Sequence, residues 1–173
     1  MLSEVPFDLM YGGTVFYPVH QNVIWTLLLG LLGIRLMEAA RAKGKRWLYV
    51  LTCAAVVVLG FALGTLGMVD YYGAGVLTVF AFYFFRERKW WCLLGQLAAL
   101  YWLNVAVLGG QMYPVTLFGR EIELCEQGLA LLALVPIWLY RGRQGHHSKA
   151  FQYACYAFYP AHMLVLALLT MIQ

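Results

Sequence analysis

The chain has 173 residues, of which 63% are hydrophobic and 12% are charged, and its mean hydropathy is +0.72. Because soluble domains average about 25% charged residues, this composition excludes an ordinary soluble fold and predicts a protein that crosses a lipid bilayer several times. The formal net charge of +4 comes from basic clusters between apolar segments, which indicates membrane orientation and not nucleic-acid binding.

The chain begins with a short polar stretch that runs directly into an apolar segment. This stretch, residues 3–20, carries Glu4, Asp8 and His20 among turn-forming residues. It has no basic or apolar leader region, so it does not read as a signal peptide. We interpret it as a candidate site at a membrane boundary.

Six apolar segments follow, and they predict an all-α, polytopic membrane helix bundle that forms a single domain. About 20 apolar residues are needed to cross the hydrocarbon layer as a helix. The predicted helices cover approximately residues 21–40, 47–69, 72–85, 90–108, 122–140 and 150–172.

Two of these helices have notable beginnings. The third has too few residues to cross about 30 Å unaided, so either the bilayer thins there or Asp70, in the preceding turn, lies below the head groups. For the fifth, we expect Glu121 and Glu123 to cap its start, where carboxylates suit the helix dipole. Glu126 and Gln127 would then lie about one turn inside it.

The basic residues predict the orientation. They gather in the connections after the first, third and fifth helices, at residues 41–46, 86–89 and 141–149. The positive-inside rule places these connections in the cytoplasm and both chain ends outside.

His162 is the strongest candidate for chemistry inside the membrane, where ionisable groups are costly. It lies about 12 residues into the last helix, or roughly 18 Å at about 1.5 Å per residue. Tyr156 and Tyr159 share its face at three-residue spacing, and Pro160 removes a backbone hydrogen bond there. A neutral histidine that bonds to a neighbouring helix accounts for the same pattern.

His20 is the second candidate. It lies near Asp8 in the sequence, and the turn that contains Asp70 is expected at the same boundary. An imidazole beside a carboxylate is a plausible general base, because its pKa lies near neutrality. An ordinary interfacial residue before a helix is an equally good explanation.

The four cysteines are scattered singly, without CxxC spacing, so neither a metal site nor a disulfide is predicted.

Several short motifs occur in a fixed order along the chain. They are SEVPFD from Ser3, HQNV from His20, DYYG from Asp70, QGLALLAL from Gln127, RGRQG from Arg141 and FYPAH from Phe158. This order resembles the TraX family of bacterial integral membrane proteins over nearly all of the chain. Family members begin with further helices that carry an Asp-His pair, so the resemblance leads us to expect that the present chain lacks the family's N-terminal helices.

The resemblance implies a multi-pass protein of the bacterial cytoplasmic membrane that acts in conjugation. The implied reaction is acetyl transfer from acetyl-CoA, as co-substrate, to a pilin-like protein or another acceptor. The alternative is a non-catalytic membrane scaffold or binding component, or a remnant of such an enzyme. No permanently bound cofactor or metal is expected.

The candidate residues fall into three groups. The catalytic candidates are His162, His20, Glu126 and Tyr159. The candidates for orienting the substrate are Glu4, Asp8, Asn22, Asp70, Tyr71, Gln127 and Tyr156. The candidates for holding the phosphates of CoA are Arg141 and Arg143.

Overall fold

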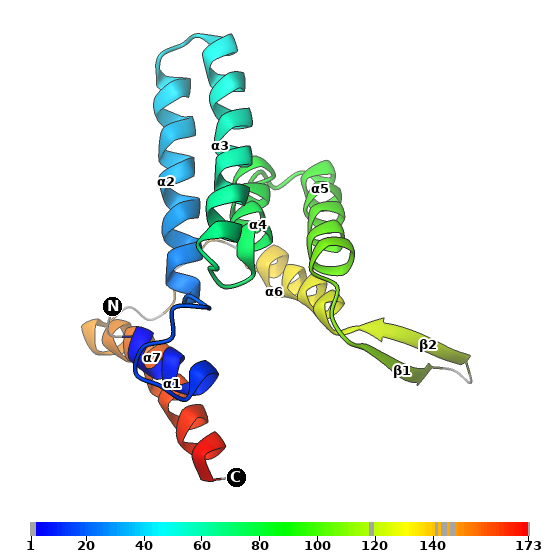
Figure 1. Ribbon diagram of the computed structural model, residues 1–173. Helices are drawn as coiled ribbons and strands as arrows, with labels where there is room; N and C mark the ends of the chain where they lie inside the picture. Colours follow the sequence, from blue (N-terminus) through cyan, green and yellow to red (C-terminus); the bar gives the residue numbers. More distant parts are fainter. Residues whose placement is uncertain (1–2, 118–119, 141, 143–144, 146–147, 173) are drawn as a thin grey trace.

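A computed structural model of the protein describes residues 3–117, 120–140, 142, 145 and 148–172. Helices make up most of these residues, and one strand hairpin extends away from them (Figure 1). The α-helices are α1 (Glu4–Gly12), α2 (Val23–Ala42), α3 (Arg46–Leu66), α4 (Tyr72–Phe84), α5 (Trp90–Tyr101), α6 (Leu134–Leu139) and α7 (Lys149–Ile172). The remaining elements are the π-helix η1 (Trp102–Leu108), the strands β1 (Met112–Leu117) and β2 (Arg120–Cys125), and the 3₁₀-helix η2 (Glu126–Ala133).

The predicted helical membrane bundle is confirmed. Four helical segments are long and apolar enough to cross a membrane, namely Val23–Ala42, Arg46–Leu66, Trp90–Leu108 and Lys149–Leu169. Two further apolar segments, Tyr72–Phe84 and Glu126–Leu139, are shorter. The prediction of six spans therefore stays a prediction.

The predicted start of the fifth helix at residue 122 is wrong. Residues Arg120–Cys125 form β2, which pairs antiparallel with β1 from Met112 opposite Cys125 to Leu117 opposite Arg120. Acidic and apolar residues alternate strictly from Glu121 to Leu124, and this period of two is typical of a strand. Glu121 and Glu123 are consequently strand residues and not helix caps.

The same change moves Glu126, which is the first residue of η2 instead of lying a turn inside a helix.

At the start of the chain, the helix α1 was not predicted. It ends at Gly12 and is capped by Gly13, whose φ of +64° favours glycine and whose N–H donates to the carbonyl of Leu9 at 3.2 Å.

The best-packed part of the molecule lies where α2, α3 and α4 meet. Phe80 of α4 is 2% exposed and fills a notch between Gly33 of α2 and Gly60 of α3. A Cβ atom at Gly33 would lie 2.6 Å from the Phe80 ring, and one at Gly60 would lie 2.7 Å from it. Close packing here therefore requires that both positions lack a side chain, as small-residue helix contacts in membranes do.

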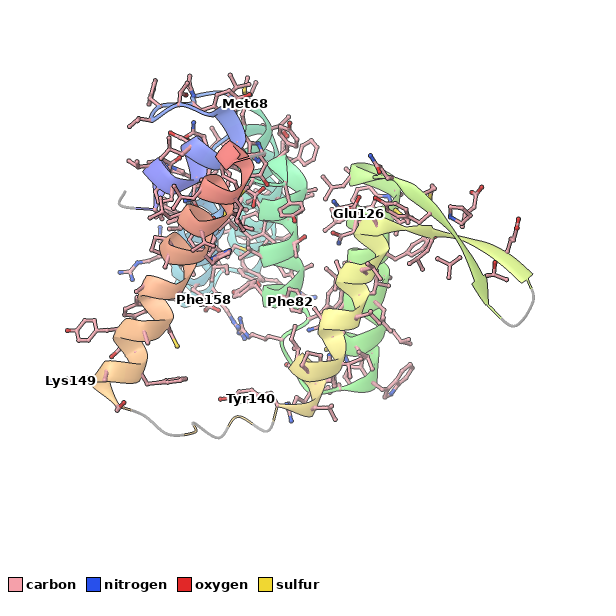
Figure 2. The ribbon with its side chains drawn as sticks, turned by 90° about the horizontal axis from the view of Figure 1, so that it is seen from below. Met68, Phe82, Glu126, Tyr140, Lys149 and Phe158 are labelled. Atoms are coloured by element: carbon pink, nitrogen blue, oxygen red, sulfur yellow. The ribbon has the colours of Figure 1, made fainter. Side chains whose placement is uncertain are left out.

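Helix α7 packs against α1 below the α2–α3 pair (Figure 1). In the view from below, Tyr140, which follows α6, and Lys149, at which α7 begins, lie well apart from each other (Figure 2). The end of the molecule at which α2 begins therefore gathers α1, α7 and the turn between α3 and α4.

Candidate functional site

A histidine and a carboxylate meet at this end of the molecule. The Nε2 atom of His20 lies 3.3 Å from Oδ1 of Asp70. The segments that carry them are joined by the backbone, because the N–H of Gln21 donates to the carbonyl of Met68 at 2.8 Å. Gln21 and Val69 also form an isolated parallel bridge. Two turns that are about 50 residues apart in the sequence are thus held side by side.

Aromatic rings surround the imidazole. The ring of Phe7 stacks on His20 with 5.5 Å between centroids, Tyr11 lies at 5.1 Å, and Tyr72 approaches edge-on at 6.2 Å. The side chains of His20 and Asp70 keep 21% and 19% of their surface exposed. The pair is therefore sheltered from water and still open to a substrate.

The electrostatics of the pair follow from this partial burial. Burial raises the pKa of the Asp70 carboxyl above its ordinary value, and the neighbouring His20 opposes this rise without cancelling it. Burial, and after it the charge of Asp70, also raises the pKa of the Tyr11 hydroxyl. Because Nε2 faces Asp70, the carboxylate orients the imidazole as it does in a base–orienter arrangement.

Glu4 and Asp8 hold the segment that contains His20. An oxygen of Asp8 accepts the backbone N–H of Tyr17 at 3.1 Å, and an oxygen of Glu4 accepts that of Asn22 at 3.4 Å. The other oxygen of each carboxyl is buried and has no hydrogen-bond partner among the described residues. The two acids therefore bind the backbone before and after His20 in the sequence, which makes them positioning residues.

Asn22 ties α2 to both α1 and α7 and is completely buried. Its side-chain oxygen accepts the N–H of Ile24 at 3.0 Å, which caps α2, and also the hydroxyl of Tyr159 at 3.1 Å. Its amide donates to the carbonyl of Ser3 at 3.1 Å. One side chain thus joins three helices at the edge of the site.

His162 lies next to this joint on α7. Its Nδ1 atom is 3.1 Å from the carbonyl of Phe158, and its ring stacks on Phe158 and meets Tyr159 edge-on at 5.4 Å. Within the described part of the chain, no ion pair links His162 to a carboxylate. Tyr156 is 66% exposed and receives a hydrogen bond from Gln152 at 2.8 Å.

The remaining candidates are distributed over other places. Tyr71 and Gln127 line a cavity that adjoins the site. Glu126 is exposed, and its backbone N–H donates to Gln111 at 3.0 Å. Arg141 and Arg143 lie outside the described residues. No group of three or more histidine, cysteine or acidic side chains with metal-site geometry occurs among the residues that the structure describes.

The rings that enclose His20 were not predicted as site residues. Phe7 belongs to the SEVPFD motif and Tyr72 to the DYYG motif, and this was the sequence signal that could have identified them as site residues. Tyr11 lies outside these motifs, so no sequence signal identified it. The structure brings together residues of four motifs: Glu4 and Asp8 of the first, His20 and Asn22 of the second, Asp70 of the third and Tyr159 of the last.

The chain matches a known protein family. The family model described as TraX protein matches residues 1–170. No curated protein and no solved structure matches the chain.

Proposed function

The chain belongs to the TraX family, and from this membership together with the site geometry we propose that it is a membrane acyltransferase. The single observation that carries the proposal is the His20–Asp70 pair, with 3.3 Å between Nε2 and Oδ1. A histidine oriented by a carboxylate in a sheltered, open site is the arrangement that general-base catalysis requires.

In the proposed reaction, His20 removes a proton from the acceptor. The donor is acetyl-CoA, which the predicted orientation places on the opposite face of the membrane from His20, so its thioester has to reach across the protein to the base. The acceptor is an amine, as in a pilin-like protein or another molecule that reaches the membrane boundary. The acceptor nitrogen attacks the thioester carbonyl carbon, a C–N bond forms and the C–S bond breaks. The proton passes from nitrogen to His20 and then to the departing thiolate, so that an amide and free CoA result.

The surrounding residues have supporting roles in this proposal. Asp70 orients the imidazole and stabilises its protonated form. Glu4 and Asp8 keep the His20 segment in place through the backbone N–H groups of Tyr17 and Asn22. Such positioning matters because general-base catalysis depends on the distance between the base and the proton that it removes.

The basic residues at the other end of α2 do not belong to this site. Arg41 and Arg86 line a cavity of about 220 Å³ together with Tyr49 and Tyr83. The 20 residues of α2 place that end about 30 Å from His20 at about 1.5 Å per residue. We therefore assign these arginines to membrane orientation, in a bacterial cytoplasmic membrane, and not to the reaction.

The test is transfer of a labelled acetyl group from acetyl-CoA by purified protein in nanodiscs. His20→Ala and Asp70→Asn should lower the rate by about 10²–10⁴-fold, the usual contribution of a general base. Glu87→Gln is the matched control, because Glu87 is an exposed acid in the loop between α4 and α5 and pairs with Lys89.

Two outcomes would contradict the proposal. Full activity of His20→Ala together with its loss in His162→Ala would assign the base to α7 instead. Absence of transfer to every acceptor by the wild-type protein would favour the non-catalytic scaffold.

A further inference from the structure

A cavity of about 340 Å³ begins beside the His20–Asp70 pair and lies between α2, α4, α5–η1 and η2–α6. Tyr71, which follows Asp70 in the chain, lines it. So does Thr26, whose hydroxyl donates to the backbone carbonyl of Asp70 at 2.8 Å. The cavity and the candidate site therefore share the turn between α3 and α4.

The polar side chains of the cavity gather at the end nearest this turn. The α5–η1 helix runs back along α4, so Asn104, near its end, lies beside the start of α4. Gln127 lies at the start of η2, which packs against η1. Within the described residues, the amide of Gln127 makes no side-chain hydrogen bond, which leaves it able to bind a ligand.

The far end of the cavity is apolar. From Gly75 to Phe82, its wall extends about 10 Å along α4 at about 1.5 Å per residue. The hydroxyl of Thr78 lies between them and is already bonded to its own helix at 2.9 Å. Ile137 lies beyond this on α6, and Figure 2 shows α4, at Phe82, and α6 on opposite sides of this space.

Two irregular helices form part of the wall. The π-helix η1 contributes Asn104 and Leu108, and the 3₁₀-helix η2 contributes Gln127 and Ala130. Long π- and 3₁₀-helical stretches are uncommon and often mark functional sites. At membrane depth, irregular backbone is tolerated where it is buried in protein or lines a cavity. The two irregular helices thus indicate that this cavity belongs to the fold as a functional feature and is not a packing defect.

We propose that this cavity binds the acyl chain of an amphipathic membrane lipid, whose head group lies at the Tyr71–Asn104–Gln127 end. Its volume falls in the range of ligand pockets, and its polarity changes along its length as that of a lipid does. It is continuous with the bilayer, because Leu27 and Ile137 on its rim are 48% and 44% exposed on apolar helices. The amide of Gln127 is placed to donate to the ester carbonyl of the lipid.

This position brings an amine-bearing head group to His20. The lipid would then be an acceptor of the transfer reaction, and this part of the inference rests on the proposed function. The binding of the acyl chain does not rest on it, because the apolar end of the cavity, at Phe82 and Ile137, lies away from the His20–Asp70 pair. Binding and transfer can therefore be measured separately.

The experiment uses phosphatidylethanolamine that carries a photoactivatable diazirine on one acyl chain, added to the full chain in phosphatidylcholine nanodiscs. A probe at the end of the acyl chain should label the protein around Phe82 and Ile137. A probe next to the ester should label it around Asn104 and Gln127. This depth pattern on the wild-type protein requires no variant, so it cannot be lost through misfolding.

Two variants complete the test. Ala130→Trp, which places an indole in the cavity, should abolish this labelling, whereas Ala98→Trp on the exposed side of α5 should leave it unchanged. His20→Ala should keep the labelling even where it loses transfer, which separates failure of the catalytic proposal from failure of the binding proposal. The inference would be overturned if the labelling were spread evenly over the exposed faces of the helices and were unchanged in Ala130→Trp.

Discussion

The joint at Asn22 allows a quantitative test of how the site is held together. Replacing it by alanine removes the cap of α2 at Ile24, the acceptor of the Tyr159 hydroxyl and the donor to the Ser3 carbonyl. Because Asn22 is completely buried, water cannot replace these bonds without opening the structure. We expect Asn22→Ala to loosen α1 and α7 from α2.

The expected loss of stability follows from the three bonds. Loss of a helix cap costs about 1 kcal/mol. Each of the two other hydrogen bonds contributes about 1 kcal/mol, and a buried group left unpaired can cost more. The free energy of unfolding of Asn22→Ala should therefore fall by about 3 kcal/mol. Tyr159→Phe removes only one of these bonds and should cost about 1 kcal/mol.

The measurement is reversible unfolding in detergent micelles with an increasing fraction of a denaturing detergent. A double-mutant cycle of Asn22→Ala and Tyr159→Phe should give a coupling free energy of about 1 kcal/mol, since the two share one bond. Gln21→Ala is the neighbouring control, because its side chain makes a single exposed hydrogen bond, to Pro18. A cost for Asn22→Ala no larger than that of the lost cap, with no coupling, would refute the reasoning.

Three further predictions concern packing and charge. Gly33→Ala should destabilise the protein by about 1–3 kcal/mol, because the added methyl would meet Phe80 at 2.6 Å, and Phe80→Leu should recover part of this loss in the same unfolding assay. Trp138→Phe loses the 2.7 Å bond from its indole N–H to Gln96 and should lower the melting temperature in detergent, with unchanged stability as the contradicting result. Burial holds the pKa of Asp70 above 3.8, so the stability that its protonation contributes is fully present below that pH and is lost as the pH rises through the raised pKa. Asp70→Asn should remove this part of the pH dependence of unfolding, and an identical pH profile in both proteins would contradict the assignment.

The helical segments were predictable because apolar runs of sufficient length have few alternatives in a membrane. The helix starts near residues 21, 47, 72, 90 and 150 agree with α2, α3, α4, α5 and α7 to within two residues. The hairpin β1–β2 was missed, although Glu121 and Glu123 alternate with apolar residues. When a short alternating run lies next to a long apolar run, a prediction from sequence tends to assign both to one helix.

The site was predictable only in its components. His20 and Asp70 stood out as ionisable groups at the ends of apolar segments, and the structure places them 3.3 Å apart. The ring of Tyr11, the bond between Asn22 and Tyr159 across 137 positions, and the cavity beside them could not be derived from local patterns. None of these contacts leaves a periodic trace in the sequence.

The sequence by itself determined that this chain enters a membrane, where the long apolar helices lie and to which family it is similar. These properties depend on hydrophobicity and on short motifs, which are local. The tertiary structure alone decided which helices are neighbours. Neighbouring helices are set by side-chain packing between them, as where Phe80 of α4 packs against Gly33 of α2 and Gly60 of α3. It also decided that α1 and α7 close one end of the molecule around His20, since the buried hydrogen bonds of Asn22 require α1, α2 and α7 to meet at that point.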